Sequence, residues 1–118
     1  MMAKAKVKEP ITYEYVVDKV RKTFEHADAR QIFEHIAIEV DIVGEGAGAF
    51  YFEVAGRAIC VEPYNYYDND GRITAAADVL IALADKKMTL RKALDKGLVR
   101  FEGNEQKLYE CLEKVKLR

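Results

Sequence analysis

Residues 36–54 read IAIEVDIVGEGAGAFYFEV. Apolar side chains occupy every second position on both sides of a glycine-rich segment, residues 44–48. A period of two is typical of a strand with one buried face. Because a short turn sequence separates the two runs, we expect the strands to pair as an antiparallel hairpin. The centre of the domain is therefore predicted to be a β-sheet.

The sheet is predicted to continue toward the carboxyl terminus. Residues 55–57 form a second turn sequence, and residues 58–62 form a third strand that Pro63 ends. Residues 64–70 are a polar and aromatic loop, and residues 73–75 suit a short fourth strand. Since short turns join the first three strands, we expect each of them to be antiparallel to the next.

Helical spacing of apolar residues flanks the sheet on both sides. Before the sheet, helices are expected at residues 11–25, behind Pro10, and at residues 29–33. After the fourth strand, Asp78 is expected to cap a helix at residues 79–85, and Thr89 a helix at residues 90–96 that Gly97 ends. A strand at residues 98–102 and a last helix after Asn104 follow. This order predicts the α+β class, with one mainly antiparallel sheet of about five strands covered on one face by helices.

The totals fit one globular domain of 118 residues. The net charge of −1 gives no reason to expect a nucleic-acid partner. Residues 1–10 are predicted to be a flexible basic tail, and residues 11–118 a single domain. The tail lacks the apolar run of a signal peptide, no window has the ~20 apolar residues of a membrane span, and the final VKLR differs from the peroxisomal Ser-Lys-Leu signal. A cytoplasmic location is expected.

Two patterns that look like ligand-binding motifs are better interpreted as turns. The glycines of residues 44–48 precede a strand, whereas a phosphate loop precedes a helix. Residues 68–73, DNDGRI, match the middle of a calcium loop, but Tyr66 and Ala77 stand where oxygen ligands are needed. The chain has no serine, and its two cysteines lie in apolar patterns typical of reduced thiols. No catalytic residue, metal ligand or cofactor is therefore predicted.

Positive charge is concentrated in one segment, residues 86–100. Its basic residues are Lys86, Lys87, Arg91, Lys92, Lys96 and Arg100. Only Asp95 opposes them, although the whole chain is almost neutral. The segment, and Lys86, Lys87, Arg91, Lys92 and Lys96 in particular, suits transient docking on an anionic membrane surface. The alternative is an ordinary solvated face.

Residues 73–115 carry a recognisable order of features. An apolar helix is followed by a lysine-rich connection at residues 85–88, a small helix that ends at Gly97, and the segment GLVRFEGN at residues 97–104 before an amphipathic last helix. This stretch resembles the second half of the sterol carrier protein type 2 family. The glycine-rich turn at residues 44–48 also lies where that family turns.

The resemblance implies an apolar tunnel between the sheet and the helices, and binding of sterols, fatty acids, acyl esters or phospholipids without catalysis. The residues expected to line the tunnel are Phe50, Phe52, Val79, Leu83, Met88, Leu94, Phe101, Leu108 and Leu112. Leu90 replaces the proline or polar residue that the family has after the lysine-rich turn, and neither the peroxisomal tripeptide nor an attached thiolase or dehydrogenase domain is seen. Because of these departures, a fatty acyl chain is expected to suit this chain better than a sterol.

Two other functions stay open at this point. If the same apolar residues form a filled core, the domain would be an accessory or regulatory module that binds a protein partner, and self-association into a homodimer would favour it. A small isomerase-like enzyme on a similar scaffold would need a carboxylate beside apolar neighbours. Glu53 and Glu62 are the candidates for that carboxylate.

Overall fold

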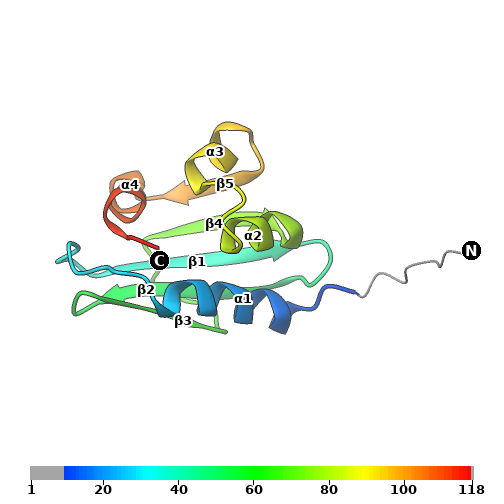
Figure 1. Ribbon diagram of the computed structural model, residues 1–118, viewed down its shortest axis with the longest axis horizontal. Coiled ribbons are helices and arrows are strands. Elements are labelled where there is room, and N and C mark those ends of the chain that lie inside the picture. Colours follow the sequence, from blue (N-terminus) through cyan, green and yellow to red (C-terminus); the bar gives the residue numbers. More distant parts are fainter. Residues whose placement is uncertain (1–9, 118) are drawn as a thin grey trace, which may run out of the picture.

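The computed structural model describes residues 10–117 (Figure 1). Its elements are α1 (Tyr13–Glu25), β1 (Ile36–Val43), β2 (Gly48–Ala55), β3 (Ala58–Glu62), β4 (Gly71–Ala76), α2 (Ala77–Ala84), α3 (Leu90–Asp95), β5 (Val99–Gly103) and α4 (Glu105–Lys114). The α+β class and the five strands are confirmed. Apart from Pro10, the predicted tail at residues 1–10 lies outside the described residues.

The central hairpin forms where the alternating pattern predicts it. β1 and β2 pair antiparallel, with Ile36 beside Val54 and Ile42 beside Gly48. The amino-terminal end of α1 packs on this turn, since the Tyr13 hydroxyl donates to the Ala49 carbonyl over 2.5 Å. A Cβ atom at Gly48 would lie 2.5 Å from the Tyr13 ring. Glycine is therefore required there for α1 to approach the hairpin.

The strand order is β3-β2-β1-β4-β5, and it contains one pairing that the sequence pattern did not predict. β4 lies parallel to β1, whereas the other neighbouring strands are antiparallel. Asp70 fixes this junction. Its carboxylate accepts hydrogen bonds from the Ala37 N–H and the Lys107 ammonium, both over 2.8 Å. The suspected calcium-loop motif thus supplies a structural carboxylate that joins β1, β4 and α4.

Most helix boundaries follow from capping side chains. Thr12, Thr89 and Asn104 accept hydrogen bonds from the first turns of α1, α3 and α4. Pro10 therefore lies outside α1, which begins two residues later than expected. The predicted Asp78 cap is wrong, because α2 begins at Ala77 and Asp78 lies in its first turn.

The short helix expected at residues 29–33 does not form. The backbone of Asp28 exchanges two hydrogen bonds with Lys116, and the Asp28 carboxylate accepts from the Arg30 N–H over 2.9 Å. A carboxylate that bonds the backbone two residues ahead favours a turn over a helix. Residues 28–32 therefore connect α1 to β1 as an irregular segment that also holds the carboxyl-terminal end of the chain.

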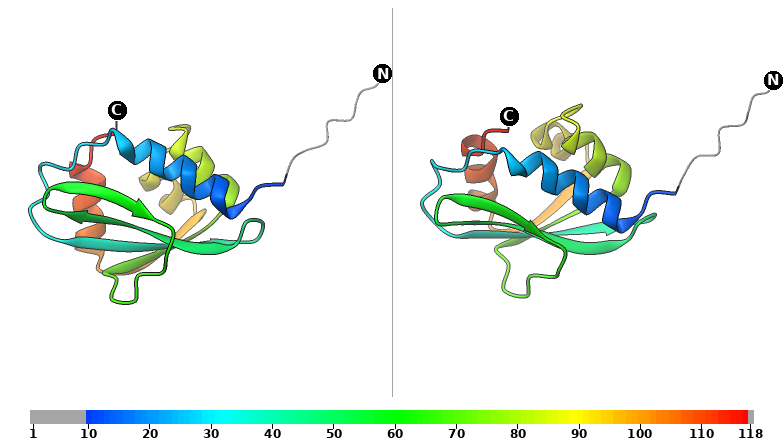
Figure 2. Two further views of the ribbon diagram at one scale, coloured as in Figure 1. Left: turned by 90° about the horizontal axis from the view of Figure 1, so that it is seen from below. Right: turned by 60° about the horizontal axis from the view of Figure 1, so that its bottom comes forward.

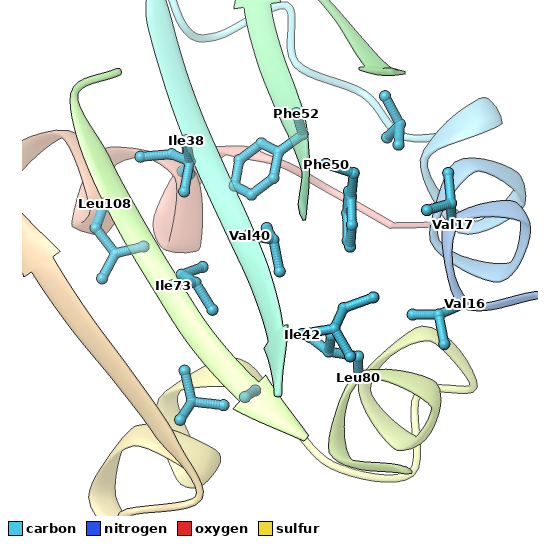
Figure 3. Packing of buried hydrophobic residues seen from close by; sticks show 14 of the residues in the cluster. Val16, Val17, Ile38, Val40, Ile42, Phe50, Phe52, Ile73, Leu80 and Leu108 are labelled. Atoms are coloured by element: carbon cyan, nitrogen blue, oxygen red, sulfur yellow. The ribbon is translucent and has the colours of Figure 1, made fainter. Parts of the chain in front are cut away.

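The helices lie on one side of the sheet, and the loop of residues 63–70 lies on the other (Figure 2). On the helix side, Val40, Phe50, Phe52 and Ile73 project from the strands into the apolar core (Figure 3). Together they form an apolar floor beneath the helices. None of the helices in residues 10–117 is long and apolar enough to cross a bilayer.

Candidate functional site

A cavity of about 510 Å³ separates the middle of the sheet from the helix layer. Its floor consists of Val40, Phe50, Phe52, Ile59 and Ile73, which come from β1, β2, β3 and β4. Its walls come from α1, α2, the connection between α2 and α3, the start of α3, α4 and the segment that follows α4. α1 packs against β3 and α2, whereas α3 packs against β5 on the opposite edge of the sheet. The helices therefore cover the two halves of the sheet and leave space over its centre.

Most of the residues predicted to line a tunnel do line this cavity. Those that line it are Phe50, Phe52, Leu83, Met88, Leu108 and Leu112. Val79, Leu94 and Phe101 do not, and instead pack as half-buried side chains against the core. The Phe101 ring lies over the backbone of Gly71, so the side chain fills the junction between β4 and β5 instead of facing the cavity.

Other lining residues were not predicted. They are Val20, Thr23, Phe24, Val40, Ile59, Ile73, Leu80, Ala84, Lys86, Thr89, Leu90, Arg91, Cys111, Val115 and Leu117. Several belong to apolar stripes visible in the sequence, such as Val20 and Phe24 on α1. Others, such as Ala84 and Leu117, reach the cavity only through contacts between distant segments.

The mouth of the cavity is marked by the lining residues that are also exposed to solvent. These are Lys86, Thr89, Arg91 and Leu117. Leu117 is held there because the neighbouring Lys116 pairs with Asp28 through backbone hydrogen bonds of 2.8 and 2.9 Å. The interior is thus apolar and its entrance carries two cations.

Cys111 lies in the cavity wall and Cys60 is exposed. Burial, together with nearby carboxylates, raises the pKa of the Cys111 thiol to about 12. The thiol is therefore neutral at physiological pH and behaves as a small apolar group. This chemistry suits a cavity wall and not a nucleophile.

The carboxylates proposed for an isomerase lie on the opposite face of the sheet. Glu53 follows the inward-facing Phe52 on β2, so the pleat directs it away from the cavity. It lies 2.6 Å from His35 Nε2 and accepts from the Tyr66 hydroxyl over 3.2 Å. Glu62 lies across the sheet beside Tyr51 on the same face. In the described part of the chain, no carboxylate lines the cavity.

Glu39 on this second face is buried, whereas the alternating pattern predicted a solvent-facing residue. The loop of residues 63–70 covers it, and its carboxylate accepts from the Tyr66 N–H over 2.9 Å. Burial opposes the charge of Glu39, but hydrogen bonds and the Arg72 guanidinium outweigh it and lower the pKa of that carboxyl. Burial and the Glu39 charge raise the pKa of the neighbouring Asp41. Glu39 thus fastens the loop to the sheet. Residues 10–117 contain no group of three side chains arranged to hold a metal ion.

A family model described as the SCP-2 sterol transfer family matches residues 18–111. Comparison with curated proteins gives no significant match. Among solved structures, the fold is similar to a domain of the secondary alkylsulfatase PisA1 from Pseudomonas, with a TM-score of 0.66 and 14% identity. That match covers 90% of this chain and 16% of the sulfatase, so the chain spans only a small part of that enzyme.

Two further structures match along most of both chains. The ubiquinone synthesis protein UbiJ-SCP2 has a TM-score of 0.61 and 17% identity, and the match covers 86% of this chain and 90% of that protein. Sterol carrier protein 2 from Aedes aegypti, solved as a complex with palmitate, has a TM-score of 0.55 and 14% identity, with 87% and 94% covered. At these identities the structural matches establish a shared fold.

Proposed function

Because the chain belongs to the SCP-2 sterol transfer family, we propose that it binds and transfers one lipid, with its acyl chain in the cavity, and catalyses no reaction itself. The single observation that carries this proposal is the apolar cavity of about 510 Å³ between the sheet and the helices. Its volume lies within the range of about 300–1,000 Å³ found for small-molecule sites. Its lining fits an acyl chain better than a polar substrate.

The free energy available from such a cavity is sufficient for binding without a reactive group. Burying an acyl chain gains about 0.8 kcal/mol for each methylene removed from water. The roughly fourteen methylenes of a sixteen-carbon acid would therefore contribute about 11 kcal/mol, and with an association cost of about 4 kcal/mol, the low end of its range, about 7 kcal/mol remains, which corresponds to a micromolar Kd. The fold-related Aedes aegypti protein was solved with palmitate, which supports a fatty acid as the ligand to test first.

The absence of a carboxylate among the described lining residues supports a carrier over an isomerase-like enzyme. The fold also occurs within a larger sulfatase, where the match covers 16% of that chain. A fatty acid, an acyl ester, a phospholipid and a sterol-like lipid are the ligand classes to compare. A cytoplasmic location stays a prediction from the sequence.

The test uses a residue type that the chain lacks. The sequence contains no tryptophan, so Leu112→Trp introduces a single fluorophore into the cavity wall. Tyr67→Trp is the control, because Tyr67 lies in the loop of residues 63–70 on the opposite side of the sheet, is fully exposed and does not line the cavity. A fatty acid with a spin label on its chain is expected to quench the first variant at about one ligand per chain and to leave the second bright.

Native mass spectrometry and solvent extraction of the unmodified protein complete this test. A co-purified lipid at about one per chain supports the proposal and identifies the ligand class. A bare protein that also fails to quench with labelled fatty acid would overturn it. In that case the module that binds a protein partner, including a second copy of this chain, becomes the leading explanation.

We also propose that the basic surface, defined as Lys87, Arg91, Lys92 and Lys96, docks on anionic membranes during lipid exchange. All four residues are exposed, and within residues 10–117 none of them forms an ion pair with a carboxylate. Arg91 belongs both to this surface and to the cavity mouth, so a docked protein would face the bilayer with its entrance nearby. Each well-placed cation near such a surface contributes about 1 kcal/mol.

Sedimentation with vesicles that contain phosphatidylserine tests the docking. Lys87→Glu combined with Lys92→Glu is expected to weaken binding strongly, while fatty-acid capacity in the absence of vesicles stays unchanged. Lys92→Glu alone is compared with Lys22→Glu, which changes the charge equally on α1. Equal vesicle binding by the double variant and the parent would end this proposal.

A further inference from the structure

Lys86 adopts a backbone conformation that is unusual for a lysine. It follows the end of α2 with a φ of 63°, in the left-handed region. Its N–H donates to the Leu83 carbonyl over 3.1 Å, and the Lys87 N–H donates to the Ala82 carbonyl over 2.9 Å. These two bonds define the Schellman motif, in which glycine is the preferred residue at the position of Lys86.

The same chain provides an internal comparison at the end of α3. There the Gly97 N–H donates to Leu94 over 3.1 Å, and the Leu98 N–H donates to Ala93 over 2.9 Å. Gly97 has a φ of 75°, so the two helices end with the same motif. One motif uses the residue that this conformation favours, and the other has a lysine in its place. Strain of this kind is concentrated at functional sites.

The lysine that occupies the strained position lies at the cavity mouth. Lys86 lines the entrance together with Arg91 and the hydroxyl-bearing Thr89. The Arg91 guanidinium lies 5.6 Å from the centre of the Tyr109 ring, a contact that orients it. The entrance presents two cations beside an apolar interior.

We propose that Lys86 and Arg91 select the ligand by holding an anionic head group at the mouth while the acyl chain occupies the cavity. This inference rests on the proposed lipid binding and deepens it by naming the ligand class, a single-chain lipid that carries a carboxylate or a phosphate monoester. Charge-assisted hydrogen bonds from an ammonium and a guanidinium suit either head group. Glycine would suit this backbone better than lysine, and the proposal assigns the lysine side chain a contact with the head group.

Lys86→Gly tests the proposal because the structural and functional effects have opposite signs. Glycine relieves the left-handed strain, so the melting temperature is expected to stay equal or rise. Palmitate binding is expected to weaken roughly two- to five-fold, the range for an exposed charge pair. Binding of hexadecanol, which has a similar chain and no charge, is expected to stay within error. Arg91→Gln should also weaken palmitate binding and leave hexadecanol binding unchanged. Lys87→Gln, outside the cavity lining, should change neither affinity.

The outcomes distinguish this inference from the proposed function. If neither palmitate nor hexadecanol binds the parent protein, the lipid-binding proposal fails. If both bind and Lys86→Gly changes the two affinities by the same factor, lipid binding stands and selection by the head group is refuted. Lysophosphatidate identifies the head group. If it binds more tightly than palmitate and is more sensitive to both variants, the phosphate is preferred; the reverse order indicates the carboxylate.

Discussion

The length of the ligand's acyl chain is the variable that reports most directly on the cavity. In a series of saturated fatty acids, each step of two carbons is expected to add about 1.6 kcal/mol of binding free energy, or about fifteen-fold in Kd, while the added methylenes remain inside the protein. At about 30 Å³ for a group the size of a water molecule, a cavity of about 510 Å³ holds about seventeen such groups. The gain is therefore expected to continue to chains of about sixteen to eighteen carbons and then to stop.

Displacement of a fluorescent fatty acid, measured below the micelle concentration of each competitor, gives these affinities. Leu112→Trp adds volume to the wall and should move the plateau to a shorter acyl chain, whereas Tyr67→Trp, outside the cavity, should leave it in place. An affinity that does not depend on acyl-chain length would refute the reasoning, because it would mean that the acyl chain lies outside the cavity. A plateau at eight carbons would show that most of the cavity does not accept ligand.

Other predictions concern the thiols, the Asp70 junction and the close contact of two strands. At pH 8 a thiol reagent should label Cys60 before Cys111, whose raised pKa of about 12 leaves little thiolate, and bound fatty acid should slow only Cys111, as measured by mass spectrometry. Burial opposes the charge of Asp70, but Lys107 and the Ala37 N–H outweigh it and hold the pKa of Asp70 below its usual 3.8. Asp70 therefore stabilises the fold above pH 3.8, and this contribution is lost as the pH falls through the lower pKa of the folded state. Asp70→Asn should cost about 2 kcal/mol at pH 7 in urea unfolding and reduce the loss of stability in acid; an unchanged acid limb would contradict this. Gly103→Ala should lower the free energy of unfolding by about 1–3 kcal/mol, because Gly103 has a φ of 130° and a Cβ there would lie 2.5 Å from Gly71 Cα. An unchanged melting temperature would show that β4 and β5 can move apart at this point.

The features that the sequence predicted well depend on neighbouring residues. Alternation in residues 36–54 identified the hairpin, and the turn at residues 55–57 placed β3 at its observed bounds. Thr89 and Gly97 marked both ends of α3, because a cap and a left-handed stop act within one helical turn. For Asp78 the same rule failed, because α2 follows β4 directly and begins without a side-chain cap.

The features that the sequence missed depend on contacts between distant segments. Asp28 is drawn into a bridge with Lys116, which no local pattern near residues 29–33 could indicate. Glu39 is buried by a loop whose position follows from the parallel pairing of β1 and β4. For the cavity, the apolar stripes identified several of the wall residues, but only packing decided which of them line the empty space.

The parallel neighbour of β1 has a consequence for how the protein is made. β4 lies beside β1, and not beside β3, the strand that precedes it in the chain. As the ribosome releases the polypeptide, α1 and β1 to β3 emerge before β4, the parallel neighbour of β1, and before α2, α3 and α4. Part of the apolar floor, including Val40, is then expected to remain uncovered until residues 71–114 follow. Nascent chains of this kind attract chaperones and aggregate when synthesis pauses, so the interval between β3 and α4 is the most vulnerable stage of production.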